Sequence, residues 1–256
     1  MNIKLSTRDL LLLESLYANI FLSFYQIRDL HFKGLAKPTV YNRLSKLIRA
    51  GFVKTSRVNL RAYHKENSDV GVIYQITKKG LNMIRLCSSG KTFKAEPMPV
   101  NTSSLYHDLA LTDVIKAFEG GLRCQSVVNT KVTPSSRFGD SRIPDAIITA
   151  SKPDSNLKSS WALELELTAK SEKRYRDIIL NYKLNDYEKI IYVVLNDGIA
   201  KKVGASVSGF GHNHKLGDST GKFYFVKLAD LFTGEATITN GKENIFINPQ
   251  TIKESD

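Results

Sequence analysis

The sequence predicts an α+β protein of two domains, and three observations support this class. The chain has 256 residues, of which 42% are hydrophobic and 24% charged, which suits two small hydrophobic cores and excludes a disordered or collagen-like chain. Helical and strand patterns follow one another in two blocks that differ in element order. The positive charge, a formal net of +12, is concentrated in the first block.

The uneven distribution of charge points to a polyanionic partner. Residues 1–90 hold 15 Lys and Arg against 5 Asp and Glu, whereas residues 91–256 hold 22 against 20. A basic field on one small domain attracts nucleic acid, because binding releases condensed counterions. We therefore expect double-stranded DNA as the partner. An anionic membrane surface is the weaker alternative, since the basic residues are dispersed and do not follow one amphipathic helix.

The sequence also indicates a cytoplasmic protein that is not inserted in a membrane. No apolar run approaches the roughly 20 residues that cross a bilayer. The N-terminal segment MNIKLSTRDLLLLESLY contains acidic residues and no small-residue cleavage site, so no signal peptide is expected. The only two cysteines, Cys87 and Cys124, lie in different predicted domains, which excludes a disulfide framework and a CxxC pair.

The first domain, residues 1–90, has the element order of a winged helix-turn-helix. Ser6 or Thr7 is expected to cap a first helix, and Ser23 a short second helix. The third helix, KPTVYNRLSKLIRAG, has proline in its first turn and ends at Gly51 in a left-handed conformation. Two strands, FVKTSRV and VIYQIT, follow around a polar basic tip, before KKGLNMIRL starts another helix. This order is typical of a winged helix.

The polar face of the third helix and the basic wing supply donors for phosphates and base edges. The predicted DNA-contacting residues are Thr39, Tyr41, Asn42, Arg43, Lys46, Arg49, Arg57 and Arg61. A solvated helix surface, or a wing that contacts another protein, is the alternative interpretation. Tyr41 could equally be a packing residue.

A linker is predicted at residues 91–104, which contain two prolines and show no hydrophobic period.

The second domain, residues 105–256, has the order helix, three strands, helix, strand. Its segments are LYHDLALTDVIKAFEGG, LRCQSVVNTKV, IPDAIITA, WALELELT, a helix at about 171–182, and KIIYVVL. Residues 197–221, rich in glycine, serine and lysine, are expected to form a DNA-contacting loop. FYFVKLADLF then predicts a strand and a short helix before a frayed end.

Three carboxylates of the second domain are predicted to meet at one site. Asp145 opens one strand, and Glu164 and Glu166 alternate within the next, so both glutamates point to the same face of the sheet. Two carboxylates among apolar neighbours are costly to desolvate without a cation. Oxygen ligands of this kind suit Mg²⁺ or Mn²⁺. The alternative is the solvent face of an edge strand.

Asp145 and the run Glu164-Leu165-Glu166, set on this element order, resemble the PD-(D/E)xK restriction-endonuclease-like fold with its mixed sheet. With the winged helix in front and LYHDLALTDV leading in, residues 5–195 resemble the replication-relaxation family and the related MobC-type plasmid relaxases. The resemblance implies that Asp145 and Glu164 hold a divalent metal, while a lysine polarises the attacked phosphate or water.

This chain has Glu166 at the position of that lysine. The positive charge is then expected from Lys170, Lys173 or Arg174 of the following helix, or Glu166 binds the metal itself. A histidine recurs in the family at the segment that contains His107, which implies acid–base or phosphate-contacting chemistry there. The predicted catalytic residues are Asp145, Glu164, Glu166, His107 and Lys173, with Asp145, Glu164 and Glu166 as metal ligands.

The expected function is that of a plasmid mobilization relaxase, a site- and strand-specific DNA nickase that uses Mg²⁺ or Mn²⁺ at an origin of transfer or replication. An accessory mobilization protein and a coupling protein are possible partners. The first alternative is a non-catalytic DNA-binding regulator of replication or transcription on a degenerate nuclease fold. A weaker one is a dimeric defence nuclease that makes double-strand cuts.

Other residues with chemical potential have simpler interpretations. His212 and His214 have the spacing of a metal-ligand pair, but no acidic or cysteine partner accompanies them. Tyr175, Tyr182 and Tyr187 are candidates for a covalent nucleophile, as tyrosines are in many relaxases. Helical packing is the favoured role, because Tyr182 falls at an apolar position of its helix.

Overall fold

The computed structural model divides the chain into two compact units, residues 1–113 and residues 114–256. Both units combine helices with strands, in agreement with the predicted α+β class, and the larger sheet is mixed. No described helix is long and apolar enough for a membrane span. The residues described are 3–58, 71–88, 93, 96–122, 124–133, 142–151, 158–213, 219–233 and 236–247, with the side chains of 210–213 and 219–220 excepted.

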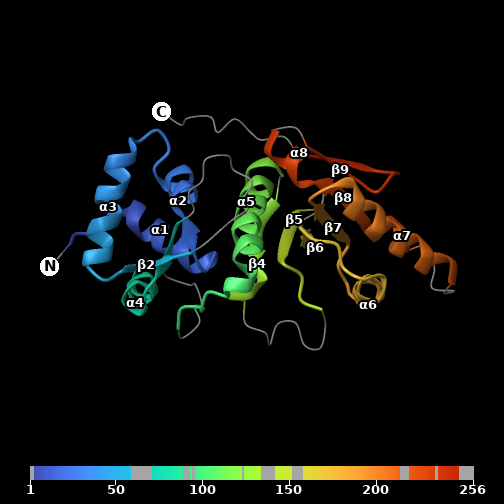
Figure 1. Cartoon of the computed structure of the whole chain (residues 1–256), viewed down its shortest axis with the longest axis horizontal. Helices are drawn as coiled ribbons and strands as arrows, with labels where there is room; N and C mark the ends of the chain where they lie inside the picture. The colour runs from blue at the N-terminus through green and yellow to red at the C-terminus, as the bar shows by residue number, and fades with distance from the viewer. Residues whose placement is uncertain are drawn as a thin grey trace. The chain divides into compact units, whose positions relative to one another are not determined.

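Unit 1 consists of short helices around a small antiparallel sheet (Figure 1). Its strands are ordered β1-β3-β2, so that β3 is central. Its described elements are α1 (Thr7–Ala18), β1 (Leu22–Ser23), α2 (Phe24–His31), α3 (Lys37–Arg49), β2 (Val53–Arg57), β3 (Val72–Ile76), α4 (Lys78–Cys87) and η1 (Thr102–Ser104). Helix α5 (Leu105–Gly121) begins in unit 1 and ends in unit 2.

Local sequence explains where these helices begin and end. Ser6 caps α1 and Ser23 caps α2, each through a capping box with the residue three positions later. Gly51, which follows α3, has a φ of 78°, a left-handed conformation that glycine adopts without a steric penalty. Strand β1 has only two residues, and its pairing with β3 was not predicted from the sequence.

The boundary between the units differs from the predicted linker at 91–104. Gln26 of α2 is buried and donates from Nε2 to the carbonyl oxygen of Leu109 at 2.9 Å and to Asp113 Oδ1 at 3.1 Å. Phe93, inside the predicted linker, packs edge-on against Tyr17 of α1, with 5.1 Å between ring centroids. These contacts join the first half of α5 and part of the predicted linker to unit 1, which extends to residue 113.

Unit 2 is built on a seven-stranded sheet of order β10-β9-β8-β7-β6-β5-β4. Strands β6, β7 and β8 are parallel, whereas the pairs on either side are antiparallel. Its described elements after α5 are β4 (Cys124–Asn129), η2 (Thr130–Val132), β5 (Ala146–Ser151), β6 (Lys158–Glu166), α6 (Glu172–Lys183), β7 (Lys189–Val194), α7 (Asp197–Asn213), η4 (Ser219–Lys222), β8 (Phe223–Lys227), α8 (Leu228–Thr233), β9 (Ala236–Thr239) and β10 (Asn244–Ile247). The order predicted from α5 to β7 is confirmed.

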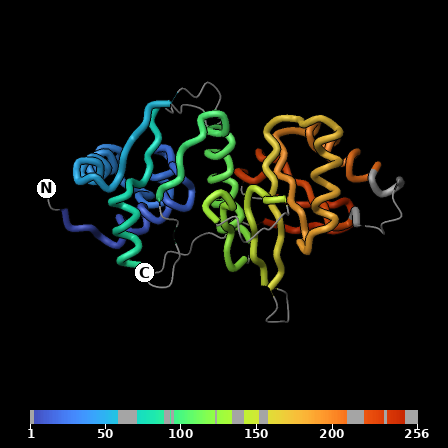
Figure 2. Tube along the Cα trace, turned by 90° about the horizontal axis from the view of Figure 1, so that it is seen from below, coloured from blue at the N-terminus to red at the C-terminus, as the bar shows by residue number. Residues whose placement is uncertain are grey.

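Helices α6 and α7 pack against one face of β6, β7 and β8, and Figure 2 traces the β6–α6–β7 crossover that brings α6 there. The core on this face contains Ala162, Tyr175, Ile178, Ile179, Tyr182, Ile190, Tyr192, Val194, Ile199, Val203, Val207 and Phe223. Because Glu164 and Glu166 alternate with the residues of the opposite face, they share this face with Ala162.

The C-terminal part of the sequence prediction was wrong in two places. Residues 197–213 form helix α7 instead of a loop, because Ile199, Val203 and Val207 recur every four residues and are buried against the sheet. That burial offsets the low helix propensity of its glycines. The prediction also missed the antiparallel pair β9 and β10. The last residues, which were predicted to fray, lie outside the described part of the chain. The strand and short helix predicted for FYFVKLADLF are confirmed as β8 and α8.

Candidate functional site

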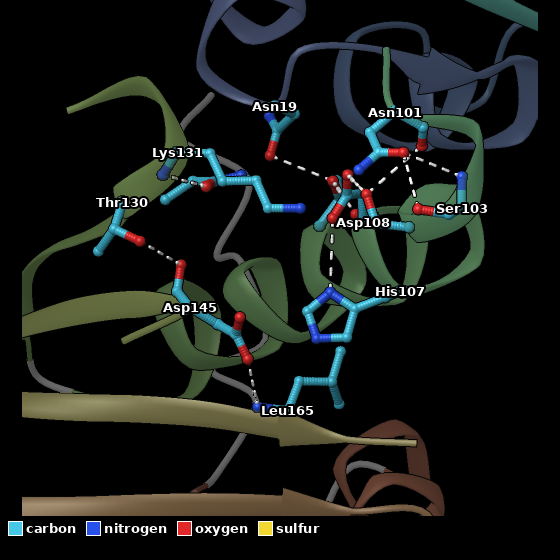
Figure 3. Close-up of polar contacts among 12 residues, drawn as sticks. Asn19, Asn101, Ser103, His107, Asp108, Thr130, Lys131, Asp145 and Leu165 are labelled. Carbon is cyan, nitrogen blue, oxygen red and sulfur yellow. Dashed lines mark hydrogen bonds and ion pairs between the residues drawn. The ribbon is translucent and has the colours of Figure 1, made fainter. Parts of the chain in front are cut away.

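Asp145 is held where β5 begins beside β6. Its backbone N–H donates to the carbonyl oxygen of Leu163 at 3.0 Å, and its Oδ2 accepts from the N–H of Leu165 at 2.8 Å (Figure 3). Thr130 fixes the other side, because its hydroxyl donates to the carbonyl oxygen of Asp145 at 3.2 Å. The carboxylate of Asp145 thus adds one hydrogen bond to those that pair β5 with β6.

Glu164 is buried beneath α6 and is bound by an arginine. Its side chain is 3% exposed, and both of its oxygens accept from Arg142, from Nε at 3.0 Å and from Nη2 at 3.0 Å. The hydroxyl of Tyr182 in α6 also donates to Oε1. The backbone N–H of Arg142 donates to Oδ1 of Asn181 at 3.3 Å, which ties the arginine to α6. Such bidentate pairing combines charge with fixed geometry.

Glu166 is paired with a different cation. Lys170 Nζ, four residues later, donates to Oε1 of Glu166, whose side chain is 1% exposed. The backbone N–H of Lys170 donates to the hydroxyl of Tyr175 at 3.1 Å, so the lysine is anchored by the first half of α6. Of the three cations proposed to replace the missing lysine, Lys170 therefore contacts the carboxylates. Lys173, the predicted catalytic residue, is exposed on the first turn of α6.

The electrostatics of this cluster follow from burial and from the two cations. Burial raises the pKa of Glu164, and the charge of Asp145 raises it further, whereas Arg142 and Tyr182 act in the opposite direction. Burial also raises the pKa of Glu166, partly offset by Lys170. Burial opposes ionisation of Arg142, but the charge and hydrogen bonds of Glu164 and Tyr182 together outweigh it and raise the pKa of Arg142. Each buried glutamate of this site is thus paired with one cation.

We call Asp145, Glu164, Glu166, Arg142 and Lys170 the carboxylate cluster. Its donor chemistry suits Mg²⁺ or Mn²⁺, but its arrangement does not. Among the residues that the structure describes, no group of three or more His, Cys, Asp or Glu side chains is placed to hold a metal. The glutamates are directed to Arg142 and Lys170, and Asp145 to a backbone amide. The residues present therefore do not fit a divalent metal in this arrangement.

Of the predicted histidines, His107 belongs to unit 1, whereas the carboxylate cluster belongs to unit 2. Nδ1 of His107 lies 3.4 Å from Oδ1 of Asp108, and Oδ2 of Asp108 accepts from the hydroxyl of Ser104 at 2.9 Å (Figure 3). Asp108 is buried. The side chain of His212, and His214 altogether, lie outside the described residues.

In unit 1, α3 divides into a buried and an exposed face. Val40, Leu44 and Leu47 are buried in the core. The predicted DNA-contacting residues that are exposed are Thr39, Tyr41, Asn42, Lys46 and Arg49 on α3, and Arg57 on β2. Arg61 lies outside the described residues. Tyr41 stacks on Phe24, with ring centroids 4.0 Å apart, and remains 49% exposed.

Arg43 is directed into unit 1 and not toward the exposed face. Its Nε donates to Oδ1 of Asp9 at 2.8 Å, while Nη2 donates to Oδ2 of Asp9 and to the carbonyl oxygen of Lys4 at 3.2 Å. Asp9 is 1% exposed. Burial opposes ionisation of Asp9, but the hydrogen bonds from Arg43 and Ser6 outweigh it and lower the pKa of Asp9. Arg43 therefore links α3 to the start of α1.

Sequence reasoning missed Arg142 and Tyr182 as partners of Glu164. The signal for Tyr182 was its position in an amphipathic helix that directly follows the strand. The signal for Arg142 was weaker. It is a basic residue three positions before Asp145, and its place in the sequence does not indicate that it contacts Glu164.

The protein is thus an α+β protein of two compact units. Unit 1 has an exposed polar helix face, and unit 2 has buried carboxylates that are paired with cations. The chain belongs to the replication-relaxation family, whose model matches residues 13–194, more than half of its length. Family membership indicates a role in replication or mobilization. Comparisons with the curated proteins and with the solved structures found no match.

Proposed function

We propose that this protein binds double-stranded DNA through unit 1, with α3 as the recognition helix of a winged helix-turn-helix. The observation that carries the proposal is the exposed face of α3, where Lys46 and Arg49 stand opposite a fully apolar buried face. The order α1-β1-α2-α3-β2-β3 and the sheet order β1-β3-β2 support this assignment.

Charge and residue type supply the chemistry of the contact. Residues 1–113 hold 17 Lys and Arg against 8 Asp and Glu, a net of +9, whereas residues 114–256 have a net of +3. Lys46 and Arg49 are suited to phosphates, and Thr39 and Asn42 to base edges in the major groove. In a replication-relaxation protein, the corresponding DNA is the origin region of a replicating or mobilizable element.

Fluorescence anisotropy with a labelled duplex from the protein's own replicon tests this proposal. Lys46→Ala and Arg49→Ala should each weaken binding and reduce the salt slope by about one released counterion. Lys78→Ala is the matched control, because Lys78 is exposed on α4, outside α2 and α3, and loses the same charge. Equal losses in all three variants would reduce the effect to general electrostatics and refute recognition by α3.

The second candidate function is strand-specific DNA nicking by unit 2, which requires that Arg142 release Glu164 so that the carboxylates can hold Mg²⁺ or Mn²⁺. The observation that favours it is the contact of Lys170 with Glu166, since it returns a lysine to the carboxylates although position 166 itself is acidic. Asp145, Glu164, Glu166 and Lys170 are then the residues closest to the PD-(D/E)xK pattern. Lys173 is exposed one turn further on and is the weaker choice for the missing lysine.

Nicking is tested by conversion of supercoiled replicon plasmid to open circles, with Mg²⁺, with Mn²⁺ and with a chelator. Glu164→Gln should abolish conversion and leave duplex binding intact. Glu172→Gln is the control, because Glu172 is an exposed glutamate of α6 that pairs only across the helix surface with Arg176. If wild type binds the duplex but yields no open circles under any condition, the result supports the non-catalytic DNA-binding alternative.

A further inference from the structure

An aromatic ring interrupts the exposed polar face of α3. Tyr41 directly precedes Asn42 and follows Thr39 by two positions, and all three side chains are exposed. The Tyr41 ring is stacked on the ring of Phe24, with centroids 4.0 Å apart and an interplanar angle of 9°. Phe24 belongs to the core of unit 1. One face of the Tyr41 ring is therefore covered by the core, while 49% of the residue stays open to solvent.

Stacking on Phe24 orients this ring before any partner binds. Phe24 is the first residue of α2, and it follows Ser23, which caps α2 and pairs with Ile73 of β3. Tyrosine has only two side-chain torsions, and a side chain that is already ordered loses little conformational entropy on binding. Tyr41 thus presents a rigid apolar surface, which is suited to contact an apolar group of the partner.

The major groove of DNA offers one such group. Unit 1 has a net charge of +9, which favours a polyanionic partner. Thymine presents a methyl group at its major-groove edge, whereas the other groups that distinguish the bases there are hydrogen-bond donors and acceptors. Tyr41 is the fifth residue of α3, within the N-terminal part with which a recognition helix contacts base edges. The adjacent Asn42 suits adenine, the base that pairs with thymine.

We infer that Tyr41 recognises the 5-methyl group of a thymine in the major groove. The inference rests on the proposed function, because it requires α3 to enter that groove. Tyr41 is then a specificity-determining residue, whereas Lys46 and Arg49 supply affinity through phosphates, which carry no sequence information. Phe24 is a positioning residue that acts by holding the ring of Tyr41.

The test compares two duplexes that differ only in their thymine methyl groups. The origin region of the protein's own replicon is amplified with dTTP or with dUTP, because uracil keeps the hydrogen bonds of thymine and lacks the methyl group. Each fragment competes with a labelled thymine duplex in fluorescence anisotropy. Wild type should bind the uracil fragment about fourfold more weakly for each contacted thymine, as expected for the loss of one buried methyl group.

Three variants separate a methyl contact from an effect of uracil on the shape of the duplex. Tyr41→Ala should bind both fragments equally, and circular dichroism checks that it is folded. Tyr41→Phe keeps the ring and its stack on Phe24, so it should retain the preference for thymine. Tyr25→Ala is the control, because Tyr25 packs edge-on against the same Phe24 from α2, with centroids 5.8 Å apart. It should leave the preference unchanged.

Three results would overturn the inference. If wild type binds the thymine and uracil fragments equally, the methyl contact is refuted, whereas DNA binding through α3 is retained. If folded Tyr41→Ala still prefers thymine, the methyl group is contacted by another side chain. If wild type binds neither fragment, the proposed function fails, and recognition of thymine fails with it.

Discussion

Replacing Arg43 by alanine should destabilise unit 1 and leave its DNA affinity nearly unchanged, although Arg43 lies on the proposed recognition helix. The guanidinium is bound to both oxygens of Asp9 and to the carbonyl oxygen of Lys4. Asp9 is also the third residue of α1 and completes the capping box with Ser6. Removal of the arginine leaves a buried carboxylate without its cation.

The magnitude follows from burial on the two sides of the pair. Breaking a buried ion pair from one side costs about 3–5 kcal/mol. The Arg43 side chain is 25% exposed, and Asp9 keeps its hydrogen bonds from Ser6, so we expect the lower end, about 3 kcal/mol. Asp9→Asn should cost a similar amount. The double variant should cost clearly less than the sum, because the interaction is lost only once.

The sign of the pH dependence is also determined. The pKa of Asp9 is lowered below its ordinary value of 3.8, so the stability from its ionised form is fully present above that pH. It is lost as the pH falls through the lower folded-state pKa. The difference in unfolding free energy between wild type and Asp9→Asn should therefore narrow at acid pH.

Urea unfolding followed by far-ultraviolet circular dichroism, with duplex binding measured in parallel, separates the two roles. Lys46→Ala, an exposed change three positions along α3, should alter stability by less than about 0.5 kcal/mol and weaken DNA binding. The reasoning is refuted if Arg43→Ala retains wild-type stability and loses DNA affinity as Lys46→Ala does.

Three further predictions concern other contacts. Burial raises the pKa of Glu166 above its ordinary value of 4.5 despite Lys170, so ionisation of Glu166 lowers the stability of the folded protein as the pH rises above that value. Glu166→Gln should therefore become more stable relative to wild type between pH 4.5 and neutrality. Unfolding can be followed by the fluorescence of Trp161, the single tryptophan. Gly80→Ala should destabilise unit 1 by about 1–3 kcal/mol in thermal unfolding, because the new Cβ would clash with the carbonyl oxygen of Phe52. Gly120→Ala is the control, because a Cβ at that position of α5 meets open space and should not destabilise the protein. Gln26→Leu should speed amide hydrogen exchange in the first half of α5 and cost about 1–3 kcal/mol, since it removes two hydrogen bonds to buried acceptors. Unchanged exchange would contradict that role.

Much of the fold could be predicted because the signals are local. Ser6, Ser23 and Gly51 act on their own helix ends through bonds that span a few residues. The order from α5 to β7 follows from hydrophobic periods within single elements. Helix α7 was missed because its glycine and serine content lowers local propensity, whereas packing of Val203 against the sheet supplies the stabilisation.

The carboxylate cluster shows the same division. A period of two along a strand is enough to put Glu164 and Glu166 on one face, and the sequence by itself determined this. It also determined that unit 1 is strongly basic. Which cation neutralises each glutamate was decided by tertiary structure, since Arg142 is 22 residues from Glu164 in the chain and is brought to it by the β5–β6 pairing and by α6.

Arg43 is the counterpart in unit 1. Its position on α3 is a matter of sequence, but its partner Asp9 lies 34 residues away, at the start of another helix. Helical period places side chains around an axis and gives no information on which buried group of a distant segment meets them. Residue type and spacing therefore determined the elements and the charge of this protein, and only the packing of those elements decided which charged groups face solvent and which neutralise one another inside.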